Sequence, residues 1–257
     1  MAHAHHLEVG DGRLAGKVAV VIGGGRGIGR ATALKLAAAG ATVVVVARTA
    51  TEVQQVVSEI KACGGRAAAQ LGDVTRADSL KRLADDLGRS HGRVDLLINS
   101  AGVSFIAPLE GTAEADLDLV LDTNLKGPYM TVKALLDLLR ASGCAQVVNI
   151  ASKVGLTGHE QVTAYTAAKA GLIGFGRALA QELSSEDIRV TTLCPGPVDT
   201  PMRWAATPHM DRSQAISAES VAETILFLAT RDCHSAIGNE VVIEAIGYDE
   251  GAVSLER

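Results

Sequence analysis

Two side chains with acid–base chemistry, Tyr165 and Lys169, stand four positions apart. On a helix, residues with this spacing share a face, so the Lys169 ammonium is expected to lie near the Tyr165 phenol. A phenol has a pKa of about 10 and is a slow base at neutral pH, but a nearby cation favours the phenolate and lowers that pKa. Tyr165 is therefore a candidate proton donor and acceptor, although such a pair alone also fits a solvated lysine beside a packed tyrosine. Ser152, at the end of a predicted strand, is a candidate hydrogen-bond partner for a substrate oxygen.

A second segment has the residues needed to bind a phosphate. Glycine makes up 27 of the 257 residues, and five of them lie in IGGGRGIG, residues 22–29. Glycines permit a tight turn and let backbone N–H groups and a helix N-terminus approach a pyrophosphate. Because this segment lies between an apolar β-branched run and an Ala/Leu-rich helix, it favours a dinucleotide site over a merely flexible turn.

The end of the second predicted strand bears on the choice of cofactor. A site for NAD commonly places a carboxylate there, about 20 residues beyond the glycine loop, to bind the ribose 2′-OH. This chain has Arg48 at that point instead, and Arg26 lies within the loop. Both could bind a 2′-phosphate through charge-assisted bonds, which favours NADP(H) over NAD(H); the alternative is that both are ordinary surface arginines.

The elements that must position these residues alternate along the chain. Short apolar runs rich in β-branched residues predict strands, and longer Ala/Leu-rich or amphipathic stretches predict helices. This order predicts an α/β fold of the Rossmann type, a doubly wound parallel sheet of seven strands with helices on both faces. The predicted strands cover residues 17–23, 41–47, 66–71, 94–102, 145–152, 188–196 and 240–243, and the predicted helices cover residues 29–40, 51–63, 77–90, 113–141, 163–183 and 218–230.

No linker, composition break or repeat divides the chain after its start. We expect one NAD(P)-binding domain over residues 14–257. Residues 1–13, with His3, His5 and His6, are interpreted as a flexible or tag-like leader.

Together the motifs resemble the short-chain dehydrogenase/reductase family in its compact single-domain form, over nearly all of residues 14–246, and its 3-oxoacyl-acyl-carrier-protein reductases in particular. Ser152, Tyr165 and Lys169 match catalytic positions of that family, and Asn124 in DTNLKG matches its catalytic asparagine. The family glycine pattern begins with Thr, where this chain has Ile22. Its N-N-A-G segment corresponds to NSAG, residues 99–102, with Ser100 in place of an asparagine.

The resemblance also implies contacts with the cofactor. The DV pair of LGDVT falls where the family contacts the adenine, and the PG segment falls where it holds the nicotinamide carboxamide. The cofactor-binding residues expected from the loop and from the resemblance are Gly23, Gly25, Arg26, Gly27, Ile28, Gly29, Arg48, Asp73, Val74, Asn99, Ala101, Gly102, Tyr165, Lys169, Pro195, Gly196, Val198 and Thr200.

The reaction that the resemblance implies is reversible hydride transfer between nicotinamide and a carbonyl or secondary alcohol. In the direction of reduction, Ser152 orients the oxygen and Tyr165 donates the proton. Lys169 lowers the tyrosine pKa and holds the nicotinamide ribose, and Asn124 takes part in a proton relay through water.

Residues 200–217 correspond to the substrate lid of the family, which is short here and should leave the pocket open. Apolar groups favour a ketone, an aldehyde or a β-ketoacyl substrate, possible acyl thioesters included. We expect substrate contacts from Val103, His159, Met202 and Trp204, although Trp204 fits a residue that packs the lid or a subunit contact equally well.

The charge, the apolar runs and the cysteine spacing argue against several classes of protein. The net charge is −5 and no Lys/Arg run occurs, which argues against nucleic acid as a partner. No apolar run reaches ~18 residues and the four cysteines form no CxxC pair, so we expect a cytoplasmic protein with no membrane span, metal or disulfide framework. The resemblance implies a homotetramer or homodimer, and for the helix that contains Gly171, Gly174 and Gly176 it implies close packing across a subunit interface.

Two other readings stay open. One is an NAD-preferring dehydrogenase of a sugar, steroid or cyclic alcohol. The other is a catalytically silent dinucleotide sensor, against which the four matched catalytic residues argue. From Glu244 onward the chain departs from the V-D-G-G ending of the family, and the role of this end is open.

Overall fold

A parallel sheet of seven strands forms the centre of the computed structural model, which describes residues 12–231 and 239–245. The strand order is β3-β2-β1-β4-β5-β6-β9, and every neighbouring pair is parallel. The chain reverses its winding direction between β1 and β4, which opens a crevice at the carboxyl ends of these strands. The strands are β1 (Val18–Ile22), β2 (Thr42–Ala47), β3 (Arg66–Leu71), β4 (Leu96–Asn99), β5 (Ala145–Ile150), β6 (Ile188–Pro195) and β9 (Glu240–Ile243).

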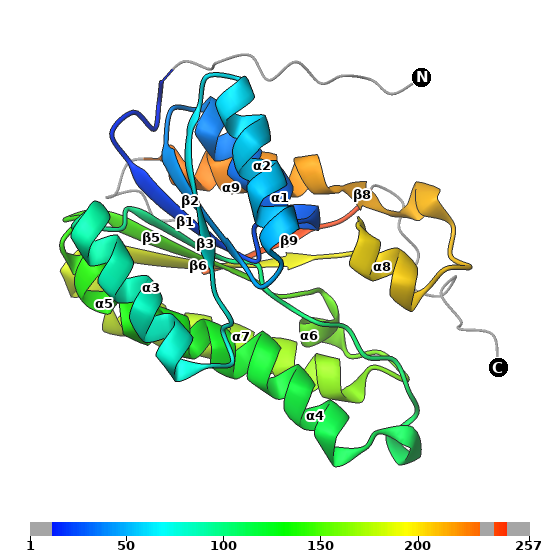
Figure 1. The fold of residues 1–257 in the computed structure, drawn as a ribbon. Coiled ribbons are helices and arrows are strands. Elements are labelled where there is room, and N and C mark those ends of the chain that lie inside the picture. The colour runs from blue at the N-terminus through cyan, green and yellow to red at the C-terminus, as the bar shows by residue number, and fades with distance from the viewer. Residues whose placement is uncertain (1–11, 232–238, 246–257) are drawn as a thin grey trace.

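Helices cover both faces of the sheet, which confirms the predicted fold class (Figure 1). Because side chains alternate along a strand, Ala19 and Val21 of β1 pack with α1, α2 and α9, whereas Val20 and Ile22 pack with α3, α5 and α7. Strand β1 is therefore apolar at every position, whereas β4 and β5 also carry buried polar residues, among them Asn99 and Asn149. These helices are α1 (Gly27–Ala38), α2 (Ala50–Ala62), α3 (Ala77–Ser90), α5 (Gly127–Arg140), α7 (Thr163–Glu182) and α9 (Ala218–Ala229).

The predicted helix over residues 113–141 is present over residues 114–140, but it is not a regular α-helix throughout. Helix α4 (Glu114–Leu121) ends in a π-helical turn, Asp122–Lys126, before α5 begins. Pro128, in the first turn of α5, has no N–H to donate to a carbonyl four residues earlier, so the regular ladder cannot continue through this point. The turn carries Asn124, and such π turns are frequent at functional sites.

The segment after β6 folds over the crevice. Strands β7 (Val198–Asp199) and β8 (Ile216–Ser217) form a separate two-stranded ladder, and α8 (Pro201–Ala206) lies between them in the chain. The Thr200 hydroxyl caps α8 by accepting the Arg203 N–H at 3.3 Å. Short helical turns complete the described elements: Leu109–Gly111, α6 (Val154–Thr157), Ser184–Glu186 and Arg212–Gln214.

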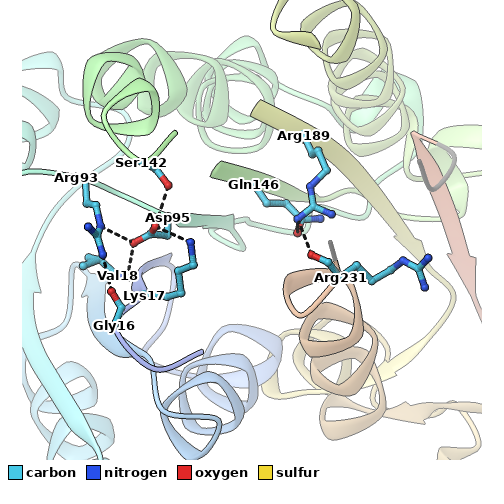
Figure 2. Close-up of polar contacts among 9 residues, drawn as sticks. All are labelled: Gly16, Lys17, Val18, Arg93, Asp95, Ser142, Gln146, Arg189 and Arg231. Atoms are coloured by element: carbon cyan, nitrogen blue, oxygen red, sulfur yellow. Dashed lines mark hydrogen bonds and ion pairs between the residues drawn. The ribbon is translucent and has the colours of Figure 1, made fainter. Parts of the chain in front are cut away.

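A buried carboxylate ties the sheet together at the edge opposite the crevice (Figure 2). Asp95, which is 2% exposed and directly precedes β4, accepts hydrogen bonds from the Val18 N–H and the Ser142 hydroxyl, both at 2.8 Å. Lys17 and Arg93 approach the same carboxylate at 3.1 Å and 3.2 Å. Because Val18 begins β1, Asp95 fixes the starting point of β4 relative to β1.

The three glycines within α7 have different surroundings. A Cβ built at Gly176 would come 2.1 Å from Thr192 Oγ1 of β6, and one at Gly171 would come 2.8 Å from Leu125 Cδ2. Contacts within the chain therefore explain these two glycines, and the expected packing across a subunit interface is not needed for them. A Cβ at Gly174 would meet nothing within 4 Å, so this glycine alone among the three leaves room for a second molecule.

Some expectations lie outside the described residues: the leader up to residue 11, Cys233, and the chain after residue 245. Within the described ranges, no helix has both the length and the apolar character that crossing a membrane requires.

Candidate active site

A cavity of about 400 Å³ opens at the carboxyl ends of the central strands. Its walls come from the segments that follow β1, β2, β3, β4, β5 and β6, together with α6, α7 and α8. Most of the predicted residues meet here although they are spread over 180 positions of the sequence. The predicted residues that line it are Gly23, Gly25, Arg26, Gly27, Ile28, Arg48, Asp73, Val74, Ala101, Gly102, Asn124, Ser152, His159, Tyr165, Lys169, Pro195, Gly196, Val198, Thr200 and Met202.

The predicted acid–base residues come from α7 and from the end of β5. The Ser152 hydroxyl hydrogen-bonds to the Tyr165 phenol, across a spacing of 13 positions. One helical turn further along α7, Lys169 Nζ lies 5.5 Å from the centre of the Tyr165 ring and donates to the Ile150 carbonyl at 2.8 Å. Lys169 is 4% exposed, so its ammonium is held inside the protein by a backbone carbonyl.

Burial sets the protonation of this pair. It raises the pKa of Tyr165 to about 12, while the hydrogen bond from Ser152 and the positive charge of Arg203 act in the opposite direction. Burial also lowers the pKa of Lys169 to about 8. At neutral pH the phenol therefore carries its proton, as a proton donor must. Lowering of the Tyr165 pKa by Lys169 stays a prediction, because burial dominates the phenol here.

Asn124 is fully buried in the π-helical turn and fixes the loop that follows β4. Its Nδ2 donates to the Val103 carbonyl at 2.9 Å and to the Val120 carbonyl at 3.0 Å, and its Oδ1 accepts the Val103 N–H at 3.2 Å. A Cβ at Gly102 would come 2.7 Å from Asn124 Oδ1 and 3.8 Å from Lys169 Nζ. Gly102 is thus the small residue that lets Asn124 and Lys169 lie on the same wall.

The glycine loop leaves space that side chains would fill. Gly23 has φ +76°, and its Cβ would come 2.6 Å from the Ala101 nitrogen, so the loop packs against the segment after β4. Gly29 permits the tightest contact, since its Cβ would lie 2.1 Å from the Gly23 carbonyl oxygen. Helix α1 begins at Gly27, at the cavity wall, with no acidic residue in its first turn. A helix N-terminus in this position is suited to an anion, and these residues fit a dinucleotide pyrophosphate.

The two arginines expected to bind a 2′-phosphate each lie near a carboxylate. Arg26 Nη1 is 4.0 Å from Glu52 Oε1, and Glu52 also lines the cavity. Arg48 lies near Asp73: burial acts to raise the pKa of Asp73, but hydrogen bonds from Thr75 and the Arg48 charge hold it below its usual value. Our sequence interpretation missed Glu52, because it considered only the residues at the end of β2.

Two predicted cofactor residues do not line the cavity. Asn99 is buried and donates from Nδ2 to Asn149 Oδ1 at 2.9 Å, across β4 and β5. Gly29 lies under the loop, against the Gly23 carbonyl, rather than at its surface. Both support the walls of the site from behind.

Two predicted substrate residues are also corrected. The Val103 side chain packs in an apolar cluster with Val120 and Ala168 and does not line the cavity. The Trp204 indole N–H donates to Asp199, and the Arg212 guanidinium lies 4.6 Å from the Trp204 ring. On α8, residues 202, 203 and 206 face the cavity, so position 204 points to the other side.

The structure adds side chains at the α6 and α8 end of the cavity to the predicted set of site residues. Arg203 and Met210 come from the lid, with Arg203 Nη2 2.7 Å from Met210 Sδ. Lys153, next to Ser152, forms an ion pair with Glu244, the residue at which the chain departs from the V-D-G-G ending. With Thr200 as the N-cap of α8, the residues of this helix that face the cavity have the spacing i, i+1, i+4. This spacing could have indicated Arg203 from the sequence. The other additions at this end are Ser104, Ile106, Val154, Thr157, Val162, Ala206 and Thr207.

Comparison with known proteins is consistent with this geometry. The family model described as short chain dehydrogenase matches residues 17–211. The chain belongs to the short-chain dehydrogenase family. This confirms the resemblance drawn from the glycine loop and the Ser152, Tyr165 and Lys169 set, and it makes the protein an NAD(P)-dependent oxidoreductase acting on CH–OH or carbonyl groups.

Relatives of this short-chain dehydrogenase match it over most of their length. It is 34% identical over 250 residues to 3-oxoacyl-(acyl-carrier-protein) reductase FabG of Thermotoga maritima, covering 94% of this chain and 99% of the relative. It is 38% identical over 223 residues to a 3-oxoacyl-(acyl-carrier-protein) reductase of Synechocystis sp., covering 84% of this chain and 90% of the relative. A solved metagenomic short-chain oxidoreductase in complex with NADP superposes with a TM-score of 0.79 at 34% identity, covering 90% of this chain and 98% of that one.

Proposed function

We propose that this short-chain dehydrogenase is an NADP(H)-dependent reductase of a ketone, an aldehyde or a β-ketoacyl group. The observation that carries the proposal is the Tyr165 hydroxyl, which burial keeps protonated and which hydrogen-bonds to Ser152 at the cavity wall. A protonated phenol beside a second hydroxyl can bind a carbonyl oxygen and protonate the alkoxide that forms during reduction. The relatives named as 3-oxoacyl reductases support the same direction.

The cofactor would be held along the wall from the glycine loop to Thr200. The loop and the start of α1 would bind the pyrophosphate, and Arg26 and Arg48 would bind the 2′-phosphate. Asp73 and Val74 line the expected adenine end, and Pro195, Gly196, Val198 and Thr200 the nicotinamide end. When bound, NADPH supplies the hydride.

The chain's own residues handle the proton. Ser152 orients the substrate oxygen and Tyr165 donates its proton to that oxygen. Lys169, charged below a pH of about 8, stabilises the phenolate left behind. Asn124 fixes the adjoining loop and would take part in a relay through water that returns a proton to Tyr165. Met202 and His159 face the part of the cavity where the substrate would lie.

The direct test is consumption of NADPH with a β-ketoacyl thioester, such as the acetoacetyl thioester of N-acetylcysteamine, and with a matched simple ketone. We expect NADPH to be oxidised with at least one of them, with NADH a poorer donor at the same concentration. Absence of turnover across β-ketoacyl thioesters, ketones and aldehydes would overturn the proposal.

Glu52 favours a second candidate, an NAD-preferring dehydrogenase of an alcohol. Its carboxylate lies beside Arg26 and would repel a 2′-phosphate, whereas it could accept a hydrogen bond from a ribose hydroxyl. The ratio of kcat/KM for NADPH to that for NADH separates the two candidates.

An assembly of two or four chains is also proposed. Tyr129 of α5 is 51% exposed and its ring centre lies 5.0 Å from that of Phe175 of α7, next to the open position at Gly174. An exposed tyrosine in contact with a half-buried phenylalanine on a second helix fits a contact between copies of the chain. Light scattering coupled to gel filtration would detect the dimer or tetramer, and a monomer would contradict this proposal.

A further inference from the structure

The backbone on both sides of Ser152 is bonded to β6. The Ala151 N–H donates to the Leu193 carbonyl at 2.7 Å. The Lys153 N–H donates to the Pro195 carbonyl at 2.9 Å. These two bonds extend the contact between β5 and β6 past the last residue of β5. The position of the Ser152 hydroxyl beside the catalytic phenol therefore depends on how this segment lies on β6.

An ion pair joins the same segment to the end of β9. The Lys153 ammonium pairs with the carboxylate of Glu244, the residue that directly follows β9. Gly196 lies between the two segments, and its N–H donates to the Ile243 carbonyl at 2.7 Å. A Cβ built at Gly196 would come 3.2 Å from Glu244 Cβ, so Glu244 lies against this glycine. The ion pair thus reaches from the segment after β5 to the segment after β9, across the segment after β6.

Lys153 also begins α6, the short helix beside the reacting centre. Its carbonyl accepts the Leu156 N–H at 2.8 Å. A Cβ at Gly155 of this helix would come 2.8 Å from the carbonyl carbon of Lys169, so α6 packs directly on α7. A displacement of Lys153 would therefore be passed both to Ser152 and to the helix that carries the catalytic lysine.

The Lys153–Glu244 pair lies at the cavity and is partly shielded from solvent. Lys153 lines the cavity, and its side chain is 20% exposed, against 38% for that of Glu244. Such a pair is screened less than one in which both groups are fully exposed. A second ion pair of β9 differs in its location: Glu240, at the start of the strand, binds Arg177 of α7, and neither residue lines the cavity.

We infer that Lys153 and Glu244 are positioning residues, whose ion pair fixes the segment after β5 so that the Ser152 hydroxyl faces the Tyr165 phenol. The inference rests on the proposed function, in which Ser152 orients the substrate oxygen and Tyr165 donates the proton. A displaced Ser152 hydroxyl loses an interaction that is strongest in the transition state. Loss of the ion pair should therefore lower kcat rather than raise KM.

A double-mutant cycle tests the pair in the full-length protein. Lys153→Met, Glu244→Ala and the double variant are compared with the wild type in the reduction by NADPH of the acetoacetyl thioester of N-acetylcysteamine. We expect kcat to fall about tenfold in each single variant, with the KM for the thioester changing less than about threefold. The double variant should be no slower than the slower single variant, because both substitutions remove the same contact. Lys153→Arg keeps the charge and should keep kcat within about threefold of the wild type.

The ion pair at the start of β9 supplies matched controls. Arg177→Met and Glu240→Ala remove an ion pair of the same strand outside the cavity, and kcat should not change. Amide hydrogen exchange of residues 151–157, measured by mass spectrometry without substrate, gives a readout that does not depend on turnover. Exchange there should be at least about fivefold faster in Lys153→Met and Glu244→Ala, and unchanged in the two controls.

The outcomes separate this inference from the proposed function. If the wild type reduces a carbonyl compound and both single variants keep its kcat, the inference fails while the proposed function stands. A double variant about a hundredfold slower than the wild type, or an equal loss of kcat in the two controls, would also overturn the inference. If no carbonyl compound oxidises NADPH, the proposed function fails, and hydrogen exchange then decides the inference: faster exchange in both variants supports it, and unchanged exchange overturns it.

The design holds even if Lys153→Met does not fold. Glu244→Ala keeps the Cβ that lies against Gly196 and removes only the carboxylate from the pair. A loss of kcat in Glu244→Ala that is absent from Lys153→Arg supports the inference, and a wild-type kcat in both variants overturns it.

Discussion

The Lys169 ammonium donates a hydrogen bond of 2.8 Å to the Ile150 carbonyl, at the end of the strand that leads to Ser152. This bond joins α7 to β5 at the point where the Tyr165 phenol and the Ser152 hydroxyl meet. Because Lys169 is buried there, its pKa falls to about 8, while that of Tyr165 rises to about 12. Of the two, Lys169 is thus the one that titrates within the range where the protein can be assayed.

A pH profile of ketone reduction tests this assignment. Lys169 is charged below a pH of about 8 and neutral above it, whereas Tyr165 keeps its proton up to a pH of about 12. The single-turnover rate is therefore expected to be level at lower pH and to fall about tenfold per unit above pH 8. In Lys169→Arg the cation does not titrate in this range, so the fall should disappear whatever the absolute rate. A wild-type profile that stays level to pH 10 would contradict the role of Lys169.

Two glycines of α7 provide a matched pair for stability. In Gly176→Ala the new Cβ would collide with the Thr192 hydroxyl, and we expect the free energy of unfolding to fall by about 3 kcal/mol. In Gly174→Ala the Cβ meets open space, and the better helix propensity of alanine should raise the free energy of unfolding by up to about 1 kcal/mol. Urea unfolding measures both. Equal effects of the two substitutions would contradict the packing described here, and dissociation of an oligomer by Gly174→Ala would place this position in a subunit contact.

Glu52 is expected to limit the preference for NADPH. Removing its charge in Glu52→Gln relieves repulsion of a 2′-phosphate near Arg26 and should raise the NADPH-to-NADH ratio of kcat/KM about fivefold. Glu59→Gln is the control on the same helix, because Glu59 pairs with Arg30 outside the cavity. A ratio that is unchanged in Glu52→Gln would show that the carboxylate does not face the bound cofactor.

Asp95 should contribute to stability in a pH-dependent manner. Burial acts to raise the pKa of Asp95, but hydrogen bonds from the Val18 N–H, Ser142 and Lys17 outweigh it and hold the pKa below its usual value. A carboxyl group whose pKa is lowered by folding stabilises the protein above its unfolded pKa of about 4, and this contribution is lost as the pH falls through the folded value. Asp95→Asn should therefore lower the free energy of unfolding by about 2 kcal/mol at neutral pH, and by less below pH 4.

The control for this experiment is Asp137→Asn. Asp137 is almost fully exposed and pairs with Arg140 on the surface, so its removal should change stability by less than about 0.5 kcal/mol. If the difference between wild type and Asp95→Asn persists unchanged in acid, the carboxylate charge is not what stabilises this edge of the sheet.

The sequence predicted the sheet because strands that are covered on both faces are rich in apolar residues, as β1 and β2 are. It also predicted which residues gather around Tyr165, since residues that follow parallel strands meet at one edge. The sequence did not predict which way side chains point on short helices such as α8. Trp204 and Arg203 are neighbours in the sequence, yet the cap at Thr200 turns Arg203 into the cavity and Trp204 towards Asp199.

The sequence also did not predict contacts between segments that are far apart in the chain. Glu52 reaches Arg26 only because α2 packs beside the glycine loop, and Val103 packs with Val120 of α4, a residue 17 positions later in the chain. The π-helical turn that carries Asn124 could have been suspected from Pro128, which interrupts an otherwise regular helical pattern.

The most direct test of the central claim is the rate of NADPH oxidation by Tyr165→Phe with the best carbonyl substrate of the wild type. The phenyl ring keeps the packing of α7 but has no proton to donate, so kcat should fall by about a thousandfold or more, with NADPH affinity measured by fluorescence changing less than about threefold. A variant that turns over at a rate close to that of the wild type would contradict the assignment of Tyr165 as the proton donor.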